Sequence, residues 1–205
     1  MKKINAVILA AGISSRLGFD KLTIKIDGKP VIRWAVEPFC VDGIDKIFVV
    51  TNPDSEDVEG ALEQISRSSR VSFIRNTNYR QGMSSSVKAA LPFIKDADAV
   101  FFHLGDKPFI KKELIGRMLD LHWKDKSSII IPEYEGEKGH PVLVEIGPLL
   151  TEAELLAGDK GLREIVDKHR ENVVSIEGDE GTVFDIDTVE ALNILKKRGY
   201  RVEKG

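Results

Sequence analysis

Short apolar runs alternate with longer amphipathic segments along most of the chain, and this alternation restricts the possible folds more than any other feature. The first run, Ile4–Ala10, ends at Gly12 and is typical of a strand that is buried on both faces of a sheet. Further strands are predicted over Lys46–Val50, Val71–Ile74, Ala97–Leu104, Ser128–Ile131, Pro141–Val144 and Val173–Ile176.

Helices are predicted between these runs. Pro30 suits the first turn of a helix that runs toward Phe39. The turn residues Asn52–Ser55 precede a helix that ends near Ile65. The other predicted helices are Ser84–Ile94, Lys111–Trp123, Lys160–His169 and Thr188–Lys197.

This order predicts an α/β protein, a three-layer α/β/α sandwich around a mostly parallel, Rossmann-like sheet. The pattern is less regular after Gly105, so we expect one antiparallel strand near Pro141–Val144. The sequence has no linker, low-complexity tract or internal repeat, and residues 1–205 are therefore predicted to form one domain.

The composition is that of an ordinary globular protein, with 42% hydrophobic and 31% charged residues. A net charge of -3 gives no global attraction to nucleic acid or to a membrane surface, so neither partner is predicted. Cys40 is the single cysteine, which excludes an intramolecular disulfide, and we expect its thiol to be buried. The apolar run Ala6–Ala11 is too short for a signal peptide or a membrane span, which favours a cytoplasmic location.

The loop after the first strand has the composition of an anion-binding loop. Small residues at Ala10, Ala11 and Gly12 allow backbone N–H groups to approach phosphate closely. Arg16 and Lys21 add positive charge to the same loop. Neither the Walker spacing nor the dinucleotide-binding glycine pattern is present, which argues against a Rossmann oxidoreductase. The loop is therefore predicted to hold a triphosphate, with a glycine turn carrying two solvated cations as the alternative.

Aspartates follow two other predicted elements. Asp106 comes directly after the strand that ends at Leu104, and Asp185 and Asp187 face the same side if their segment is extended. One or two carboxylates are enough to hold Mg²⁺ when phosphate oxygens and water complete the coordination. The alternatives are a turn residue at Asp106 and a helix N-cap at Asp187.

A glycine and three serines open the helix after the third strand. Gly82–Ser86 offer backbone and hydroxyl donors to an anion, although simple helix capping would use the same residues. His140 and the segment Gly158–Arg163 lie in later turns, where a role in loop folding is an equal alternative to ligand binding.

These motifs resemble those of a known family. LAAGISSRLGFDK is similar to the signature L-A-[AG]-G-x-[SG]-x-R-[ML]-G-x-x-K of nucleotidyltransferases related to the molybdenum cofactor cytidylyl- and guanylyltransferases. LGDKP resembles the family's L-G-D-x-P, and DIDTVEAL resembles its closing motif. GMSSS and GHP match the cytidylyl members, whereas Lys107 stands where glutamine or methionine is usual.

The resemblance implies the nucleotide-diphospho-sugar transferase type of fold and a set of roles. Catalytic roles fall on Arg16, Lys21 and Asp106, and metal binding on Asp106 and Asp187. Nucleotide binding falls on Leu9, Ala10, Ala11, Gly12, Arg16, Lys21, Asn52, Asn76, Gly82 and Ser84. Acceptor binding falls on Met83, Ser85, Ser86, Lys107 and His140.

The predicted activity is Mg²⁺-dependent nucleotidyl transfer from an NTP to a phosphorylated small molecule, with release of pyrophosphate. The resemblance favours CTP and molybdopterin carrying molybdenum, with the product passed to a molybdoenzyme. Cytidylyl or uridylyl transfer to a sugar or polyol phosphate, and guanylyl transfer to molybdopterin, remain alternatives. A nucleotide-binding regulator or a cofactor chaperone is the alternative without catalysis.

Overall fold

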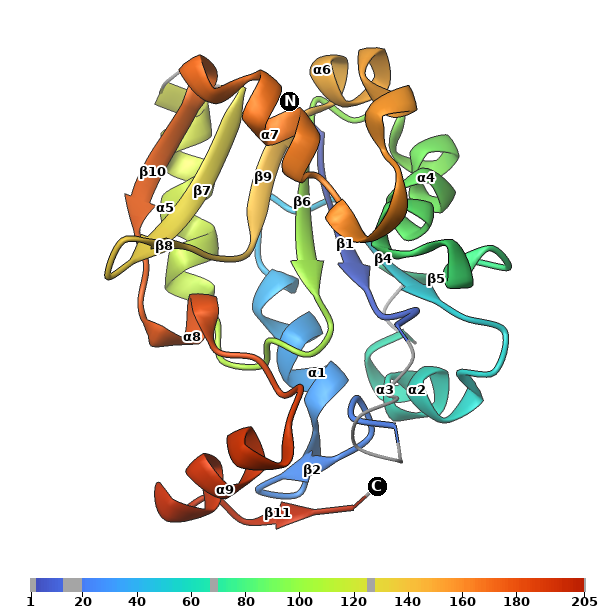
Figure 1. Ribbon diagram of the computed structural model, residues 1–205, viewed down its shortest axis with the longest axis vertical. Helices are drawn as coiled ribbons and strands as arrows, with labels where there is room; N and C mark the ends of the chain where they lie inside the picture. The colour runs from blue at the N-terminus through green and yellow to red at the C-terminus, as the bar shows by residue number, and fades with distance from the viewer. Residues whose placement is uncertain (1–2, 13–19, 67–69, 125–127, 205) are drawn as a thin grey trace.

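A computed structural model describes residues 3–12, 20–66, 70–124 and 128–204 of the chain. Within these residues eight strands form one sheet, in the order β10-β7-β9-β6-β1-β4-β5, with β8 paired to β7 (Figure 1). The strands are β1 (Ile4–Leu9), β4 (Lys46–Thr51), β5 (Val71–Arg75), β6 (Ala99–Leu104), β7 (Ile129–Tyr134), β8 (Glu137–Lys138), β9 (Val142–Glu145) and β10 (Val173–Glu177).

The pairing of the strands places several of their carboxyl ends at one edge. β1 runs parallel to both β4 and β6, and β4 runs parallel to β5. β9 is antiparallel to β6 and to β7, which confirms the antiparallel strand predicted near Pro141–Val144. Leu9 is in register with Leu104 of β6 and Val50 of β4, so the loops that follow these strands emerge side by side.

Helices cover both faces of the sheet, which confirms the predicted three-layer sandwich (Figure 1). Alternate residues of β1 face opposite sides, with Ile4, Ala6 and Ile8 in one core and Val7 in the other. The first core is closed by α1 (Val31–Val36), α2 (Glu56–Ala61) and α5 (Lys112–Lys124). The second is closed by α4 (Met83–Ile94), α6 (Ile146–Thr151) and α7 (Arg163–Lys168).

A second, antiparallel sheet was not predicted. β2 (Lys25–Ile26), β3 (Lys29–Pro30) and β11 (Val202–Glu203) pair at the same end of the molecule as α9 (Val189–Lys197) (Figure 1). Strands of two residues are too short to carry an alternating pattern. β2 and β3 form a hairpin around Asp27–Gly28, whose φ values of 51° and 80° suit a tight turn, whereas β11 pairs with β2 from the other end of the chain. The C-terminal segment therefore folds back onto residues that follow the predicted phosphate loop.

Several predicted helices are shorter than their sequence pattern. The helix expected to reach Ile65 is divided into α2 and α3 (Glu63–Ser66), and α7 begins only after Gly161, whose φ of 56° ends the preceding turn. α8 (Glu180–Val183) was not predicted. The 3-10 turns are η1 (Glu37–Phe39), η2 (Tyr79–Gln81), η3 (Ala153–Leu155), η4 (Gly158–Lys160) and η5 (Arg170–Asn172).

The expectation for Cys40 was wrong. Its side chain is exposed, because the residue caps the η1 turn where the chain leaves the core after the buried Phe39. No helix among the described residues is long and apolar enough to cross a membrane.

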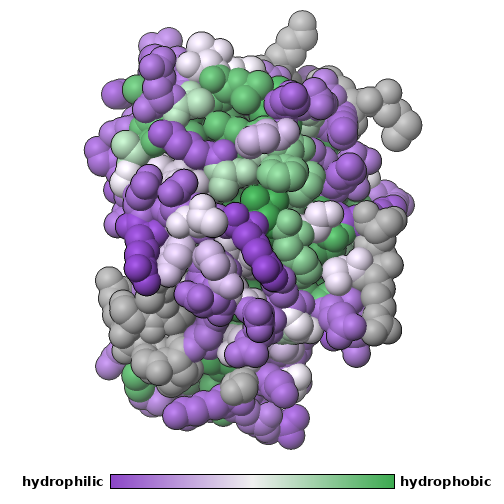
Figure 2. All heavy atoms as spheres, turned by 90° about the vertical axis from the view of Figure 1, so that its right-hand side faces the viewer, coloured by the Kyte–Doolittle hydropathy of each residue, from purple (hydrophilic) through white to green (hydrophobic). Residues whose placement is uncertain are grey.

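Apolar side chains also gather on the face that carries α4 and β5 (Figure 2). Phe93 of α4 is 55% exposed, and its ring lies 5.9 Å from that of Phe48 on β4. This helix therefore covers one edge of the sheet with an aromatic pair that is open to solvent on its outer side.

Candidate active site

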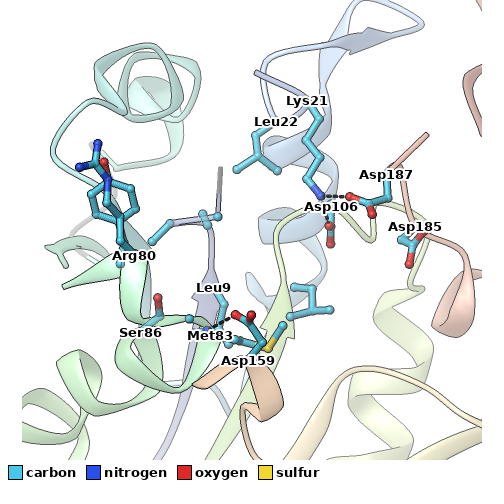
Figure 3. A pocket seen from close by; sticks show the side chains of 16 residues that line it. Leu9, Lys21, Leu22, Arg80, Met83, Ser86, Asp106, Asp159, Asp185 and Asp187 are labelled. Carbon is cyan, nitrogen blue, oxygen red and sulfur yellow. Dashed lines mark hydrogen bonds and ion pairs between the residues drawn. The ribbon is translucent and has the colours of Figure 1, made fainter. Parts of the chain in front are cut away.

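An open cavity of about 610 Å³ lies at the edge where β1 and β6 end (Figure 3). It collects residues from distant parts of the chain, among them both ends of the predicted phosphate loop and both predicted metal ligands. Its lining consists of Leu9, Ala10, Ala11, Gly12, Lys21, Leu22, Tyr79, Arg80, Gly82, Met83, Ser86, Leu104, Asp106, Asp159, Asp185 and Asp187.

Lys21 is the centre of the charged wall of this cavity (Figure 3). Its Nζ lies 2.5 Å from Asp106 Oδ2 and 2.7 Å from Asp187 Oδ1. Asp106 follows β6, Asp187 lies in the extended segment before α9, and Lys21 lies in the turn that leads to β2. The fold therefore joins one lysine and two aspartates that are far apart in the sequence.

The environment of Lys21 keeps its ammonium charged. Burial by itself would lower the Lys21 pKa, but the charges and hydrogen bonds of Asp106 and Asp187 outweigh burial and raise the pKa above its ordinary value. The site thus presents a fixed cation next to two carboxylates at any pH near neutrality.

The carboxylates have the chemistry that a divalent cation needs. Asp106 Oδ1 is buried and has no hydrogen-bond partner among the described residues, although its other oxygen binds Lys21. No group of three or more His, Cys, Asp or Glu side chains that could hold a metal occurs in the described ranges. Two carboxylates therefore suit an ion whose remaining ligands come from phosphate oxygens and water.

The N-cap alternative for Asp187 is not what the structure shows. Thr188 Oγ1 accepts the hydrogen bond from Ala191 N at 3.2 Å, so Thr188 caps α9. The Asp187 carboxylate faces the cavity instead, on the same side as Asp185 (Figure 3).

The first turn of α4 is held by a segment 76 residues further along. Met83 N donates to Asp159 Oδ1 at 3.2 Å, and Ser84 Oγ donates to Ala157 O at 3.1 Å. Gly82 has a φ of 95°, and a Cβ on it would lie 2.5 Å from the carbonyl carbon of Gly158. The Gly158–Lys160 turn therefore packs tightly against the start of α4. This contact gives a structural role to part of the Gly158–Arg163 segment, for which the sequence left loop folding and ligand binding open.

Several predicted ligand contacts are used inside the protein. Asn76 Nδ2 donates to Ser85 Oγ at 2.8 Å and to Ser86 Oγ at 3.1 Å, and Asn76 is buried. Ser84 and Ser85 are also buried, and of the three serines Ser86 alone is among the described residues that line the cavity. These side chains support the cavity wall from inside the protein, and the surface of the wall is formed by Gly82, Met83 and Ser86.

Two further predicted residues, Asn52 and Lys107, are absent from the described lining of the cavity. Asn52 Nδ2 donates to Ala11 O at 3.4 Å and so supports the phosphate loop from outside. Lys107 is buried and donates to Val183 O, so it is absent from the described residues that line the cavity. Arg16 lies outside the described residues.

A second cavity of about 380 Å³ adjoins the first and shares Leu9, Met83, Leu104 and Asp159 with it. The cations Lys138, Lys160 and Arg163, together with His140, lie among apolar side chains in its lining. Burial, followed by the charge of Lys107, lowers the pKa of His140 to about 4, so this imidazole is neutral at pH 7.

Sequence reasoning missed several residues of the two cavities, among them Tyr79, Arg80 and Asp159. Tyr79 and Arg80 precede the glycine–serine motif directly, so an extension of that motif toward its N-terminal side would have included them. The capping role of Asp159 had no local signal, because its partner is distant in sequence.

Comparisons with known proteins agree with this geometry. Residues 6–173 match the family described as the MobA-like NTP transferase domain. The chain belongs to that family. It is accordingly a nucleotidyltransferase.

Two relatives and one solved structure illustrate the range of MobA-like proteins. The molybdenum cofactor cytidylyltransferase of Escherichia coli K12 is 28% identical over 201 residues, covering 97% of this chain and 98% of the relative. The probable molybdenum cofactor guanylyltransferase of Natranaerobius thermophilus is 33% identical over 134 residues, covering 65% and 62%.

The solved structure is that of Rv0371c from Mycobacterium tuberculosis H37Rv in complex with manganese. It has a TM-score of 0.77 at 22% identity, with 96% of this chain and 98% of that chain covered. At this identity the likeness supports the fold, which is the mostly parallel nucleotide-diphospho-sugar transferase type predicted from the sequence.

Proposed function

We propose that this MobA-like protein is a Mg²⁺-dependent cytidylyltransferase that joins the CMP part of CTP to molybdopterin carrying molybdenum and releases pyrophosphate. The observation that carries the proposal is the meeting of Lys21, Asp106 and Asp187 with the Ala10–Gly12 backbone in one cavity.

The triphosphate is assigned to the loop from Leu9 to Lys21. Backbone N–H groups of Ala11 and Gly12 and the charges of Lys21 and Arg16 are suited to phosphate oxygens, whereas Ala10 N already donates to Val50 O at 2.8 Å. Asp106 and Asp187 would hold Mg²⁺, which neutralises phosphate charge when bound. Gly82, Met83 and Ser86 form the opposite wall, where the nucleoside would lie.

The reaction needs no nucleophile from the protein. An oxygen of the acceptor's terminal phosphate forms a bond to the α-phosphorus of CTP, and the bond from that phosphorus to the pyrophosphate oxygen breaks. The acceptor phosphate is already ionised at neutral pH, so no proton has to be removed. The described residues therefore act by alignment and by stabilising charge on the leaving group, and Lys21 and Arg80 are cations in the described lining that could do so.

The second cavity is the proposed acceptor site. Apolar walls formed by Phe102, Ile131 and Val142 suit a flat ring, and the nearby cations suit its phosphate. Leu9 and Met83 line both cavities, so an acceptor in the second cavity would lie next to a triphosphate in the first. The choice of CTP rests on the likeness to the cytidylyltransferase of E. coli and on the match of Gly82–Ser86 to the cytidylyl motif.

A pyrophosphate-release assay tests the proposal. The purified protein is given CTP, GTP, UTP or ATP in magnesium buffer, each with molybdopterin carrying molybdenum or with a sugar or polyol phosphate. Release with CTP and molybdopterin is the expected result. Release only with GTP and molybdopterin, or only with a sugar phosphate, would move the assignment to that alternative. Nucleotide binding without release from any pair would favour the regulator or chaperone.

A further inference from the structure

The two carboxylates of the charged wall belong to separate parts of the fold, and their spacing depends on what ties these parts together. Asp106 lies in the turn after β6, whereas Asp187 lies in the segment between α8 and α9. One tie is a backbone hydrogen bond in which Ile186 N donates to Asp106 O at 2.9 Å. The fully buried Ile186 side chain packs into the core beside this bond, and Lys21 pairs with the Asp187 carboxylate itself. The part of the segment that precedes Ile186 needs a tie of its own to the Asp106 turn.

Lys107 provides a second tie. Its Nζ donates to Val183 O at 2.5 Å and lies 3.7 Å from Asp185 Oδ2. The Lys107 side chain is only 9% exposed, whereas that of Asp185 is 51% exposed. A buried ammonium loses much of its hydration, and these two oxygens replace part of it. Lys107 thus holds the segment at Val183 and Asp185, on the N-terminal side of Asp187. The Ile186 hydrogen bond holds the same segment at the residue directly before Asp187.

His103 holds the backbone of Lys107 in place. Burial lowers the pKa of His103 to about 3, so the imidazole is neutral, and its Nε2–H donates to Lys107 O at 2.9 Å. His103 lies in β6, and its ring is fully buried. The Lys107 backbone is therefore anchored to a central strand of the sheet, and its side chain reaches across to the Asp185–Asp187 segment.

We propose that Lys107 is a positioning residue for the divalent-cation site, which holds Asp187 at the distance from Asp106 that a shared ion requires. The inference rests on the proposed function only for the ion itself, and it assigns Lys107 a role other than the acceptor contact expected from the sequence. Residues that orient metal ligands without touching the metal affect metal affinity by about ten- to a hundred-fold when they are replaced.

Replacement of Lys107 by methionine removes the donor while keeping a long unbranched side chain. Val183 O and the Asp185 carboxylate then lose the Lys107 ammonium, and the segment that carries Asp187 is held to the Asp106 turn less firmly, by the Ile186 hydrogen bond and the burial of Ile186. Binding of Mn²⁺ in the presence of CTP and without acceptor is measured for K107M and wild type by electron paramagnetic resonance. We expect the Mn²⁺ dissociation constant of K107M to rise by about ten- to a hundred-fold.

Activity gives a second readout that a merely structural role would not move. The Mg²⁺ concentration at half-maximal pyrophosphate release should rise in K107M, with kcat largely recovered at saturating Mg²⁺. K111M is the matched control, because Lys111 forms an ion pair with Asp179 at 2.7 Å in the same region but is 67% exposed. K111M should keep the wild-type Mn²⁺ affinity.

The outcomes separate the two proposals. A wild-type protein that binds no Mn²⁺ with any NTP contradicts the proposed function, whereas equal Mn²⁺ affinity in wild type and K107M overturns the role of Lys107. Thermal unfolding shows whether K107M is folded. Should it not fold, K107Q takes its place, and an Mn²⁺ affinity unchanged from wild type in K107Q overturns the inference, while a threefold or greater loss supports it.

Discussion

At the scale of single residues, the Lys21 ammonium lies where a divalent cation would bind, and a bound triphosphate would attract the same ammonium. The ammonium lies between the carboxylates of Asp106 and Asp187 and balances their charge. The Lys21 pKa is raised, so the ion pairs contribute to stability below the unfolded-state pKa of about 10.5 and lose that contribution only as the pH rises through the folded-state value. Ion binding between the carboxylates therefore requires Lys21 to turn toward the phosphates.

Replacement of Lys21 by methionine should change metal binding and turnover in opposite directions. Two carboxylates without a neighbouring cation attract a divalent ion more strongly, so K21M should bind Mn²⁺ more tightly than wild type when no nucleotide is present. Pyrophosphate release should fall by about a hundred-fold or more, because the charge that stabilises the leaving group is lost.

Both quantities are measurable on the same samples, by paramagnetic resonance of Mn²⁺ and by the pyrophosphate assay. Weaker Mn²⁺ binding by K21M without nucleotide would contradict competition between the ammonium and the ion.

At the scale of secondary-structure elements, the start of α4 and the η4 turn form one unit. The turn supplies Asp159 as a cap for Met83 N, and it approaches so closely that residue 82 has room for no side chain. The contact between α4 and the η4 turn therefore forms part of the wall of both the first and the second cavity, since Met83 and Asp159 line both.

Gly82→Ala tests this contact. The new methyl group would require a positive φ and would lie 2.5–2.6 Å from atoms of Gly158 and Asp159, so the free energy of unfolding should fall by about 1–3 kcal/mol. The KM for CTP should rise as well, because Met83 and Ser86 shift with the turn. Urea unfolding and steady-state kinetics measure the two effects.

Gly116→Ala is the control, and we expect it to change the free energy of unfolding in the opposite direction. Gly116 lies in α5, and a Cβ there meets nothing within 4 Å, so alanine should stabilise the protein by about 0.5–1 kcal/mol. Equal effects of the two substitutions would mean that the φ and the close approach at Gly82 are not the cause.

The elements also show which parts of the site a sequence can predict. The strand that ends at Leu9 and the aspartate after Leu104 follow from local patterns, because a buried parallel strand has a continuous apolar run and its loop starts where the run ends. The inward turn of Asn76 and Ser84 could not be predicted, since donors at a helix start serve a ligand or the protein equally well.

The pairing of β11 with β2 and the ties made by Lys107 depend on segments more than 70 residues apart. Such contacts have no local pattern in the sequence.

At the scale of the whole molecule, the fully buried His103 and the half-buried His140 link the stability of the fold to pH. The pKa of His103 is lowered to about 3 and that of His140 to about 4, mainly by burial. The unfolded chain binds protons on these rings below about pH 6.5, while the folded protein does not. Stability is therefore fully present above pH 6.5 and is lost as the pH falls toward 4.

Urea unfolding at pH 7 and pH 5 measures this loss. His103 alone should lower the free energy of unfolding by about 2 kcal/mol between these two pH values. The variant H103Q should show a smaller pH dependence than wild type, whatever its stability at pH 7. An identical pH dependence in the two proteins would show that His103 is not the group responsible.

The order of the chain has one more consequence. Asp187 and the strand that pairs with Lys25 and Ile26 come from the last tenth of the sequence, whereas the phosphate loop comes from the first. On the ribosome the sheet can begin to assemble while the chain is still being made, because most of its strands precede these segments. A nascent chain can therefore have its sheet in place before the segment that carries Asp187 is made, and the carboxylate pair of the cavity is completed after the scaffold that holds it.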